Sequence, residues 1–139
     1  MSAARILLAD DSSEMRQKVA ELLLPDFQLV GSVADGQQAV ESALKLHPDV
    51  IVLDISMPVL NGIQVASTLR ELRSTAKLIF LSVHADYDYV EAAFSLGVHG
   101  YVLKSRITTD LIPALEQVLR GGTFTSEFPT RKSHTPRPC

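Results

Sequence analysis

The sequence contains a single cysteine, few aromatic residues and no long hydrophobic run. The cysteine is the last residue, Cys139, which excludes an internal disulfide framework and a multi-cysteine metal site. No apolar stretch reaches the roughly 18 residues that a membrane span needs. The first residues also lack the long apolar segment of a signal peptide. We therefore expect a cytoplasmic protein that makes no contact with a membrane.

An excess of positive charge is also missing. The net charge of the 139 residues is -3, which argues against a free-standing nucleic-acid binder. Residues 121–139 differ from the rest, because they hold three basic residues, one acid, two glycines and three prolines. Proline and glycine oppose helices and central strands. We therefore expect one domain over residues 1–120 and a flexible linker or tail over residues 121–139.

Short apolar runs alternate with helical patterns along residues 1–120. The apolar runs predict five strands, at residues 5–9, 28–33, 50–53, 78–81 and 101–103. A helical pattern follows each strand, and the last one, over residues 109–120, has Pro113 in its first turn. Strands of this kind are typical of a parallel sheet with helices on both faces, so the predicted fold class is α/β.

Polar residues end four of the predicted strands. Asp10 and Asp11 follow the first strand, Asp54 the third, Ser82 the fourth and Lys104 the fifth. Each alone is explained as a helix cap, a turn residue or a solvated side chain. Because the carboxyl ends of parallel strands meet at one edge of the sheet, their joint placement predicts a functional site there.

The residue types at this edge indicate chemistry on a phosphoryl group. Three clustered carboxylates repel one another unless a cation neutralises them, and oxygen ligands suit Mg²⁺. The four histidines are scattered, so zinc and copper are not indicated. A metal beside Lys104 and Ser82 would form a pocket for a phosphoryl group. Asp54, on the central strand, is then the best-placed nucleophile.

These residues stand in recognisable motifs. They are Leu8-Ala9-Asp10-Asp11, Asp54-Ile55-Ser56-Met57-Pro58-Val59-Leu60-Asn61-Gly62, Leu81-Ser82 and Gly100-Tyr101-Val102-Leu103-Lys104. Over residues 5–120 the sequence resembles the receiver domain of two-component response regulators. The resemblance implies a flavodoxin-like (CheY-like) doubly wound, five-stranded parallel sheet in the order 2-1-3-4-5, with helices on both faces.

The resemblance also assigns roles to the acidic residues. It implies that Asp54 is the phosphoacceptor and that Mg²⁺ is the cofactor. Asp11, Asp54 and the backbone carbonyl of Ser56 match the direct metal ligands, and Asp10 matches the acid that holds the metal through water. The domain would assist its own phosphorylation and dephosphorylation without being an enzyme in the turnover sense.

Further roles follow for the remaining motif residues. Ser82 and Lys104 match the residues that contact the phosphoryl group, and Tyr101 matches the aromatic switch residue whose ring moves inward on activation. Ser105 stands where many receivers have proline. This variant resembles the NarL/FixJ-like branch, whose receivers usually precede a LuxR-type helix-turn-helix.

The resemblance implies two kinds of partner, which are other proteins and DNA. A sensor histidine kinase or a phosphotransfer protein would supply the phosphoryl group, and phosphorylation would promote a homodimer. DNA would be bound only through a C-terminal domain absent from this chain, so that the output is transcription. Two alternatives remain within the family. One is a stand-alone receiver that acts through protein contacts, and the other is a degenerate receiver that serves only as a protein-interaction module.

Two other classes of protein share parts of this pattern. A flavodoxin-like nucleotide or flavin binder would need a glycine- or hydroxyl-rich loop after the first strand, where this chain has two acids. The sequence also lacks G-x-G-x-x-G and G-x-x-x-x-G-K-[ST]. A metal-dependent phosphatase with an aspartyl nucleophile would carry a second acid two residues on, at the position of Ser56.

Overall fold

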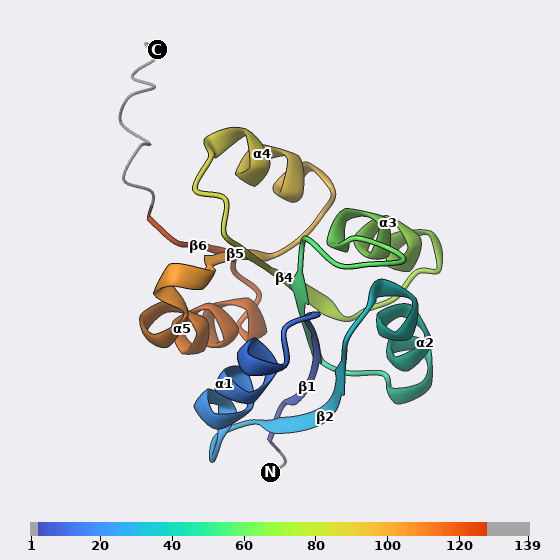
Figure 1. Cartoon of the computed structure of the whole chain (residues 1–139), viewed down its shortest axis with the longest axis horizontal. Helices are drawn as coiled ribbons and strands as arrows, with labels where there is room; N and C mark the ends of the chain where they lie inside the picture. Colours follow the sequence, from blue (N-terminus) through green and yellow to red (C-terminus); the bar gives the residue numbers. More distant parts are fainter. Residues whose placement is uncertain (1–2, 128–139) are drawn as a thin grey trace.

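A single parallel sheet runs through the protein in the order β2-β1-β3-β4-β5-β6 (Figure 1). The structure is a computed structural model that describes residues 3–127. The strands are β1 (Arg5–Ala9), β2 (Gln28–Val33), β3 (Val50–Asp54), β4 (Lys77–Ser82), β5 (Gly100–Leu103) and β6 (Phe124–Thr125). The helices are α1 (Ser13–Leu23), α2 (Gly36–Leu46), α3 (Gly62–Glu71), α4 (Tyr87–Ser95) and α5 (Ile107–Leu119), with a short 3₁₀ turn, η1 (Lys104–Arg106), before α5.

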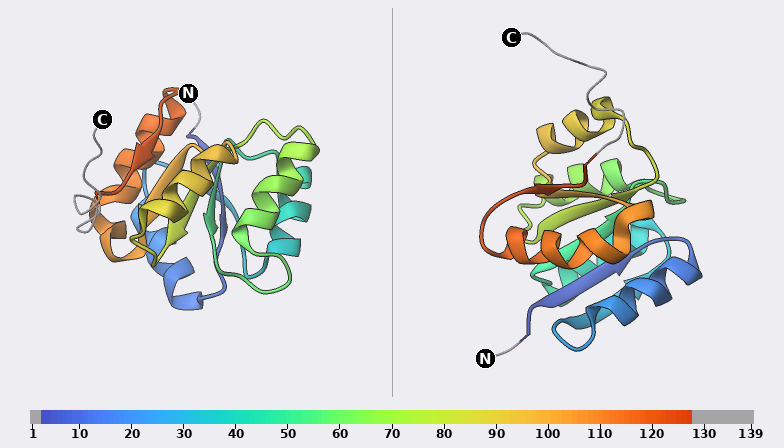
Figure 2. Two further views of the ribbon diagram at one scale, coloured as in Figure 1. Left: turned by 90° about the horizontal axis from the view of Figure 1, so that it is seen from above. Right: turned by 90° about the vertical axis from the view of Figure 1, so that its left-hand side faces the viewer.

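Alternation along the strands creates two hydrophobic cores. Side chains of successive strand residues point to opposite faces. In β1, Leu7 therefore belongs to the core that includes residues of α2, α3 and α4, and Leu8 to the core that includes residues of α1 and α5. Figure 2 shows this three-layer arrangement, with helices on both faces of the sheet. The predicted fold class and the order of the first five strands are confirmed.

A sixth strand was not predicted from the sequence. β6 pairs with β5 in parallel, with Gly100 opposite Phe124 and Tyr101 opposite Thr125. Gly121, at a φ of +94°, ends α5 and lets the chain turn back toward the sheet. The segment expected to be a linker therefore begins as an edge strand. The three prolines on which that expectation rested lie beyond residue 127, outside the described residues.

The last helix also differs from the expectation. α5 begins at Ile107, directly after η1, and Pro113 lies inside the helix and not in its first turn. The pattern of apolar residues located the helix, but the 3₁₀ turn that starts it earlier left no signal in that pattern. Proline at this position donates no hydrogen bond to the carbonyl of the preceding turn.

In residues 3–127, no helix combines the length and the apolar character that crossing a bilayer requires.

Candidate functional site

The strand ends bring the predicted residues together at one edge of the sheet. Asp10 and Asp11 directly follow β1, Asp54 is the last residue of β3, Ser82 is the last residue of β4, and Lys104 is the first residue after β5. β1, β3, β4 and β5 are neighbours and all run parallel. Their carboxyl ends therefore meet, and the residues that end them share one site.

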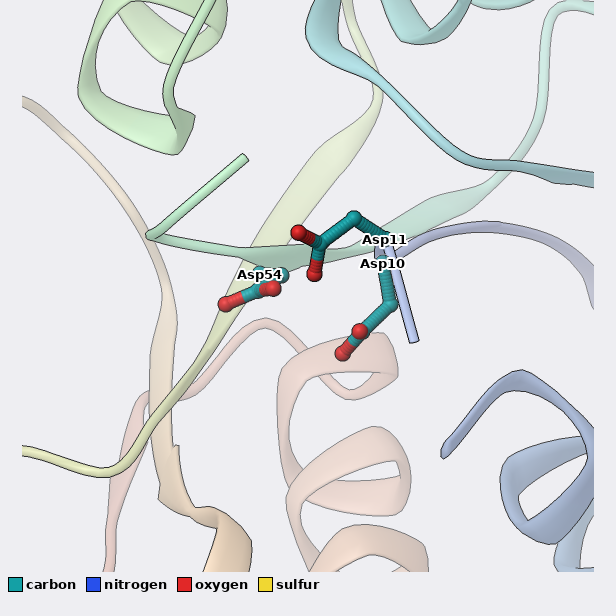
Figure 3. Close-up of side chains that lie close together, drawn as sticks. All are labelled: Asp10, Asp11 and Asp54. Carbon is teal, nitrogen blue, oxygen red and sulfur yellow. The ribbon is translucent and has the colours of Figure 1, made fainter. Parts of the chain in front are cut away.

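Three carboxylates form an acid cluster at this edge, which we define as Asp10, Asp11 and Asp54. Each offers a carboxylate oxygen, and these three oxygens lie within 4.8 Å of one another. Figure 3 shows them converging from the ends of β1 and β3, with the Asp11 carboxylate pointing toward Asp54. Asp10 and Asp54 are buried and Asp11 is exposed. The cluster therefore combines two desolvated acids with one that is open to solvent.

Lys104 is shared between the two buried acids of the cluster. Its Nζ lies 3.1 Å from Asp10 Oδ2 and 3.2 Å from Asp54 Oδ2. The lysine side chain is 17% exposed, so these contacts are partly shielded from water. One ammonium thus faces two carboxylates, and the buried part of the site keeps an excess of negative charge.

The pKa values of the site reflect this imbalance. Burial of the Asp54 carboxyl, together with the charge of Asp10, raises its pKa from 3.8 to about 6. Lys104 and the backbone N–H of Ser56 act in the opposite direction but do not outweigh it. Burial alone would lower the pKa of Lys104, yet Asp10 and Asp54 together raise it above its usual value. At neutral pH Asp54 is therefore mostly ionised beside a charged lysine.

The acid cluster fits a hard divalent cation. Asp10 Oδ2 is buried, and Lys104 Nζ, which pairs with it at 3.1 Å, is shared with Asp54. Asp10 Oδ1 and Asp54 Oδ1 are each held by one backbone N–H, from Ser12 at 2.9 Å and from Ser56 at 3.1 Å. Fixed carboxylates whose negative charge one lysine does not neutralise are suited to Mg²⁺.

Ser56, Ser82 and Tyr101 also lie at this edge. Ser56 touches the cluster through its N–H, and its carbonyl as a metal ligand stays a prediction. Ser82 is 2% exposed, and its Oγ accepts the N–H of His84 at 2.9 Å. Tyr101 is fully buried and its hydroxyl donates to the carbonyl of His84 at 2.9 Å. The ring of Tyr101 therefore already occupies an inward position.

The loop after β3 is held tightly around Asp54. Gly62 donates its N–H to the carbonyl of Ile55 at 2.7 Å, and a Cβ on Gly62 would lie 2.6 Å from the carbonyl oxygen of Asp54. Within the loop Val59 has a φ of +70°, and Leu60 N donates to Pro58 O at 2.8 Å across it. This is a strained γ-turn at a β-branched residue. Asn61 then caps α3 with a capping box to Gln64.

Two contacts near the site were not predicted from the sequence. Arg16 Nη1 donates to the backbone carbonyl of Asp10 at 2.7 Å and fixes the turn after β1. An arginine on a helix face gives no sequence signal for such a contact. The ring of His84 stacks on that of Tyr89, with centroids 4.2 Å apart and planes 7° apart. That stack links the loop after Ser82 to the start of α4.

Comparison with protein families matches residues 6–116 to the response regulator receiver domain. The chain belongs to this family. Among curated relatives, the receiver is 37% identical over 126 residues to the nitrate/nitrite response regulator NarL of Escherichia coli K12, covering 89% of this chain and 58% of that protein. It is 36% identical over 122 residues to DegU of Brevibacillus brevis, covering 86% and 52%. The chain therefore spans a little over half the length of these relatives.

Solved structures confirm the CheY-like fold and the LuxR-type branch of the receiver. A LuxR-family response regulator from Aurantimonas superimposes with a TM-score of 0.85 at 28% identity, covering 95% of this chain and 94% of that one. The isolated receiver domain of RcsB from Salmonella enterica, determined with the phosphomimetic BeF₃⁻, gives 0.84 at 25% identity, covering 94% and 98%. The predicted family and branch are thus correct.

Proposed function

We propose that this receiver domain takes a phosphoryl group onto Asp54 from a sensor histidine kinase or a phosphotransfer protein, in two-component signalling. The observation that carries the proposal is the position of Asp54. Its carboxylate is 3% exposed at the end of β3, 3.2 Å from Lys104 and within the acid cluster. A buried nucleophile with one cation in contact and two acids beside it is arranged for reaction with a phosphoryl group.

The transfer step follows from the state of Asp54. Because the pKa of its carboxyl is about 6, Asp54 is mostly ionised at neutral pH and offers an oxygen lone pair. That oxygen forms a bond to phosphorus while the P–N bond of a donor phosphohistidine breaks, and the departing imidazole takes a proton. Lys104 supplies positive charge to the phosphoryl oxygens, and Ser82, at the end of the adjacent strand, supplies a hydrogen bond.

Within this proposal the residues that would hold Mg²⁺ are Asp11, Asp54 and the carbonyl of Ser56, with Asp10 acting through water. Bound Mg²⁺ supplies neutralisation of the negative charge on the phosphoryl oxygens. The three carboxylate oxygens that lie within 4.8 Å of one another, with only Lys104 to balance the two buried acids, support the assignment of a cation to this edge. The domain holds and orients these groups, and we propose no turnover of a separate substrate.

The proposed output is transcription through a DNA-binding domain outside this chain. The chain covers 52% of DegU, which is a longer, transcriptional regulatory protein. One structural neighbour, with a TM-score of 0.85 and 25% identity, is RcsB solved as dimers bound to DNA. We accordingly propose a cytoplasmic protein that forms a phosphorylation-dependent homodimer, with a linker that includes residues 128–139.

The test is phosphorylation of the purified chain by acetyl phosphate with Mg²⁺, followed by intact mass measurement. The wild type should gain one phosphoryl mass, and Asp54→Asn should gain none, because the substitution keeps the shape and removes the nucleophile. Asp26→Asn, an exposed acid away from the site, is the matched control and should label fully. Labelling of Asp54→Asn would refute the assignment, and an unlabelled wild type would favour an interaction-only receiver.

A further inference from the structure

A second buried carboxylate, outside the acid cluster, lies where β5, α5 and β6 meet. Asp110, in the first turn of α5, is 7% exposed, and Ser126, directly after β6, is 2% exposed. Ser126 Oγ donates to Asp110 Oδ2 at 2.6 Å and accepts the backbone N–H of Leu103 at 3.1 Å. One hydroxyl therefore joins the end of β5 to the start of α5.

Arg106 and Thr109 complete this group, which we call the Asp110 cluster (Arg106, Thr109, Asp110 and Ser126). Arg106 Nε donates to Asp110 Oδ2 at 2.9 Å, and Thr109 Oγ1 donates to Asp110 Oδ1 at 3.2 Å. Burial would raise the pKa of Asp110, but the hydrogen bonds from Ser126 and Arg106 outweigh it and hold that pKa below its usual value. The carboxylate is thus a charged acceptor with several donors, the stronger kind of hydrogen-bonded group.

The contacts of the Asp110 cluster lie on both sides of Lys104 in the sequence. Leu103 precedes Lys104, and Arg106 is the last residue of the 3₁₀ turn that Lys104 begins. Asp110 holds Arg106 directly and holds the N–H of Leu103 through Ser126. The same carboxylate therefore fixes the backbone before Lys104 and the side chain that ends its turn.

We propose that Ser126 and Asp110 are positioning residues for Lys104, which keep its ammonium between Asp10 and Asp54. Neither residue touches the reacting atoms, so each acts through the turn that carries Lys104. The inference rests on the proposed phosphoacceptor function and extends the site to Ser126, which lies outside the matched residues 6–116. The segment after α5 would then help to position a residue of the phosphoacceptor site.

The first experiment compares the rate of Asp54 labelling by acetyl phosphate among variants in a double-mutant cycle. Ser126→Ala should lower the rate roughly tenfold, since small displacements of a contacting group are costly. Ser126→Thr keeps the hydroxyl and should stay within about twofold of the wild type. Thr125→Ala changes the exposed residue that precedes Ser126, is the matched control and should leave the labelling rate unchanged.

The cycle separates positioning from simple loss of structure. In the Lys104→Ala background Ser126→Ala should cause no further loss, because its effect passes through Lys104. An additive loss in both backgrounds would overturn the proposal and leave Ser126 as an anchor for β6 only. If Ser126→Ala does not fold, Arg106→Gln takes its place, because Arg106 Nε is part of a side chain that is 46% exposed and the variant removes the contact that follows Lys104 in the sequence.

A second readout does not depend on phosphorylation. The ¹⁵N signal of the Lys104 ammonium, assigned by its loss in Lys104→Ala, should be observable at low temperature while both carboxylates hold the group. It should persist in Ser126→Thr and Thr125→Ala and broaden in Ser126→Ala. An unchanged signal in Ser126→Ala would refute the positioning role. Broadening in that variant, combined with a wild type that takes no label, would count against the phosphoacceptor function alone.

Discussion

Lys104 places one ammonium between two buried carboxylates, and a single positive charge does not cancel two negative ones. The pKa of Asp54 records the difference, because burial and the charge of Asp10 raise it to about 6 despite the lysine. A raised pKa means that the ionised form of Asp54 is disfavoured in the folded state. Above pH 6 the ionisation of Asp54, the residue proposed to react, therefore lowers the free energy of unfolding.

The substitution Asp54→Asn should therefore raise the free energy of unfolding, by an amount that depends on pH. Between pH about 4 and about 6 the folded state binds more protons than the unfolded state, so stability falls as the pH rises through that window. In the absence of divalent cations, Asp54→Asn should be more stable than the wild type by about 1–3 kcal/mol at pH 7. The gain should shrink as the pH falls toward 3.8 and vanish well below it, where Asp54 is protonated in both states.

Urea denaturation at a series of pH values measures this difference. Asp26→Asn is the control, because Asp26 is exposed and makes no contact with the acid cluster. If the Asp54→Asn and wild-type curves kept a constant separation from pH 4 to pH 7, the raised pKa of Asp54 would be wrong.

Between elements, the contact of α2 with the loop after β3 shapes the surroundings of Asp54. Gly36, the first residue of α2, donates its N–H to the carbonyl of Pro58 at 3.3 Å. A Cβ on Gly36 would collide with the carbonyl oxygen of Leu60. The start of α2 therefore supports the strained turn at Val59, and this turn connects Asp54 to α3.

Gly36→Ala should consequently disturb the loop that follows Asp54. We expect a loss of about 2 kcal/mol or more, because the added methyl meets backbone that has no free space to move into. Labelling of Asp54 by acetyl phosphate should also slow, since the loop that starts at Asp54 must shift. Gln37→Ala changes the next, exposed residue and should alter neither quantity. If Gly36→Ala and the wild type had equal stability and equal labelling rates, the contact between α2 and the loop would not shape the surroundings of Asp54.

At the scale of the whole molecule, the acid cluster couples metal binding to folding. The cluster is assembled from β1 and β3, whose ends come together only in the folded chain. A ligand that binds only the native state stabilises it by mass action. The repulsion within the cluster and the binding of a divalent cation therefore act on global stability with opposite sign.

Mg²⁺ should accordingly raise the thermal midpoint. At ten times its dissociation constant the gain is about 1.4 kcal/mol, or roughly 5 °C for a domain of this size. Asp11→Ala removes the exposed acid of the cluster and should abolish most of the rise. Differential scanning calorimetry with NaCl at matched ionic strength separates binding from screening. An equal rise in the wild type and in Asp11→Ala would place the cation elsewhere.

The sequence predicted which residues meet at this edge of the sheet, because strand ends are easily recognised. Buried strands of a parallel sheet are continuous apolar runs, and the residue after each run must lie at the common edge. Asp10, Asp54, Ser82 and Lys104 were found together on this basis, as the structure shows. Their distances and the pKa of Asp54 could not be predicted, because these depend on burial by side chains from other elements.

The features that were missed arise between distant segments. Ser126 meets Asp110 and Leu103 only when β6 is in place, and a two-residue strand has no periodicity to detect. Its flanking glycines and prolines favoured a linker instead. The positive φ of Val59 likewise has no signal, since valine is not expected there.

The short pairing of β6 with β5 also determines where the domain can be shortened. At that edge of the sheet, Phe124 N donates to His99 O at 3.0 Å and Ser126 N to Tyr101 O at 2.9 Å. A chain ending at residue 120 would retain every residue of the acid cluster and leave those carbonyls uncovered. Bare strand edges recruit further strands from neighbouring chains. Residues 121–127 thus cover this edge of the sheet, and we expect a shortened receiver that extends to residue 127 to aggregate less than one that ends at residue 120.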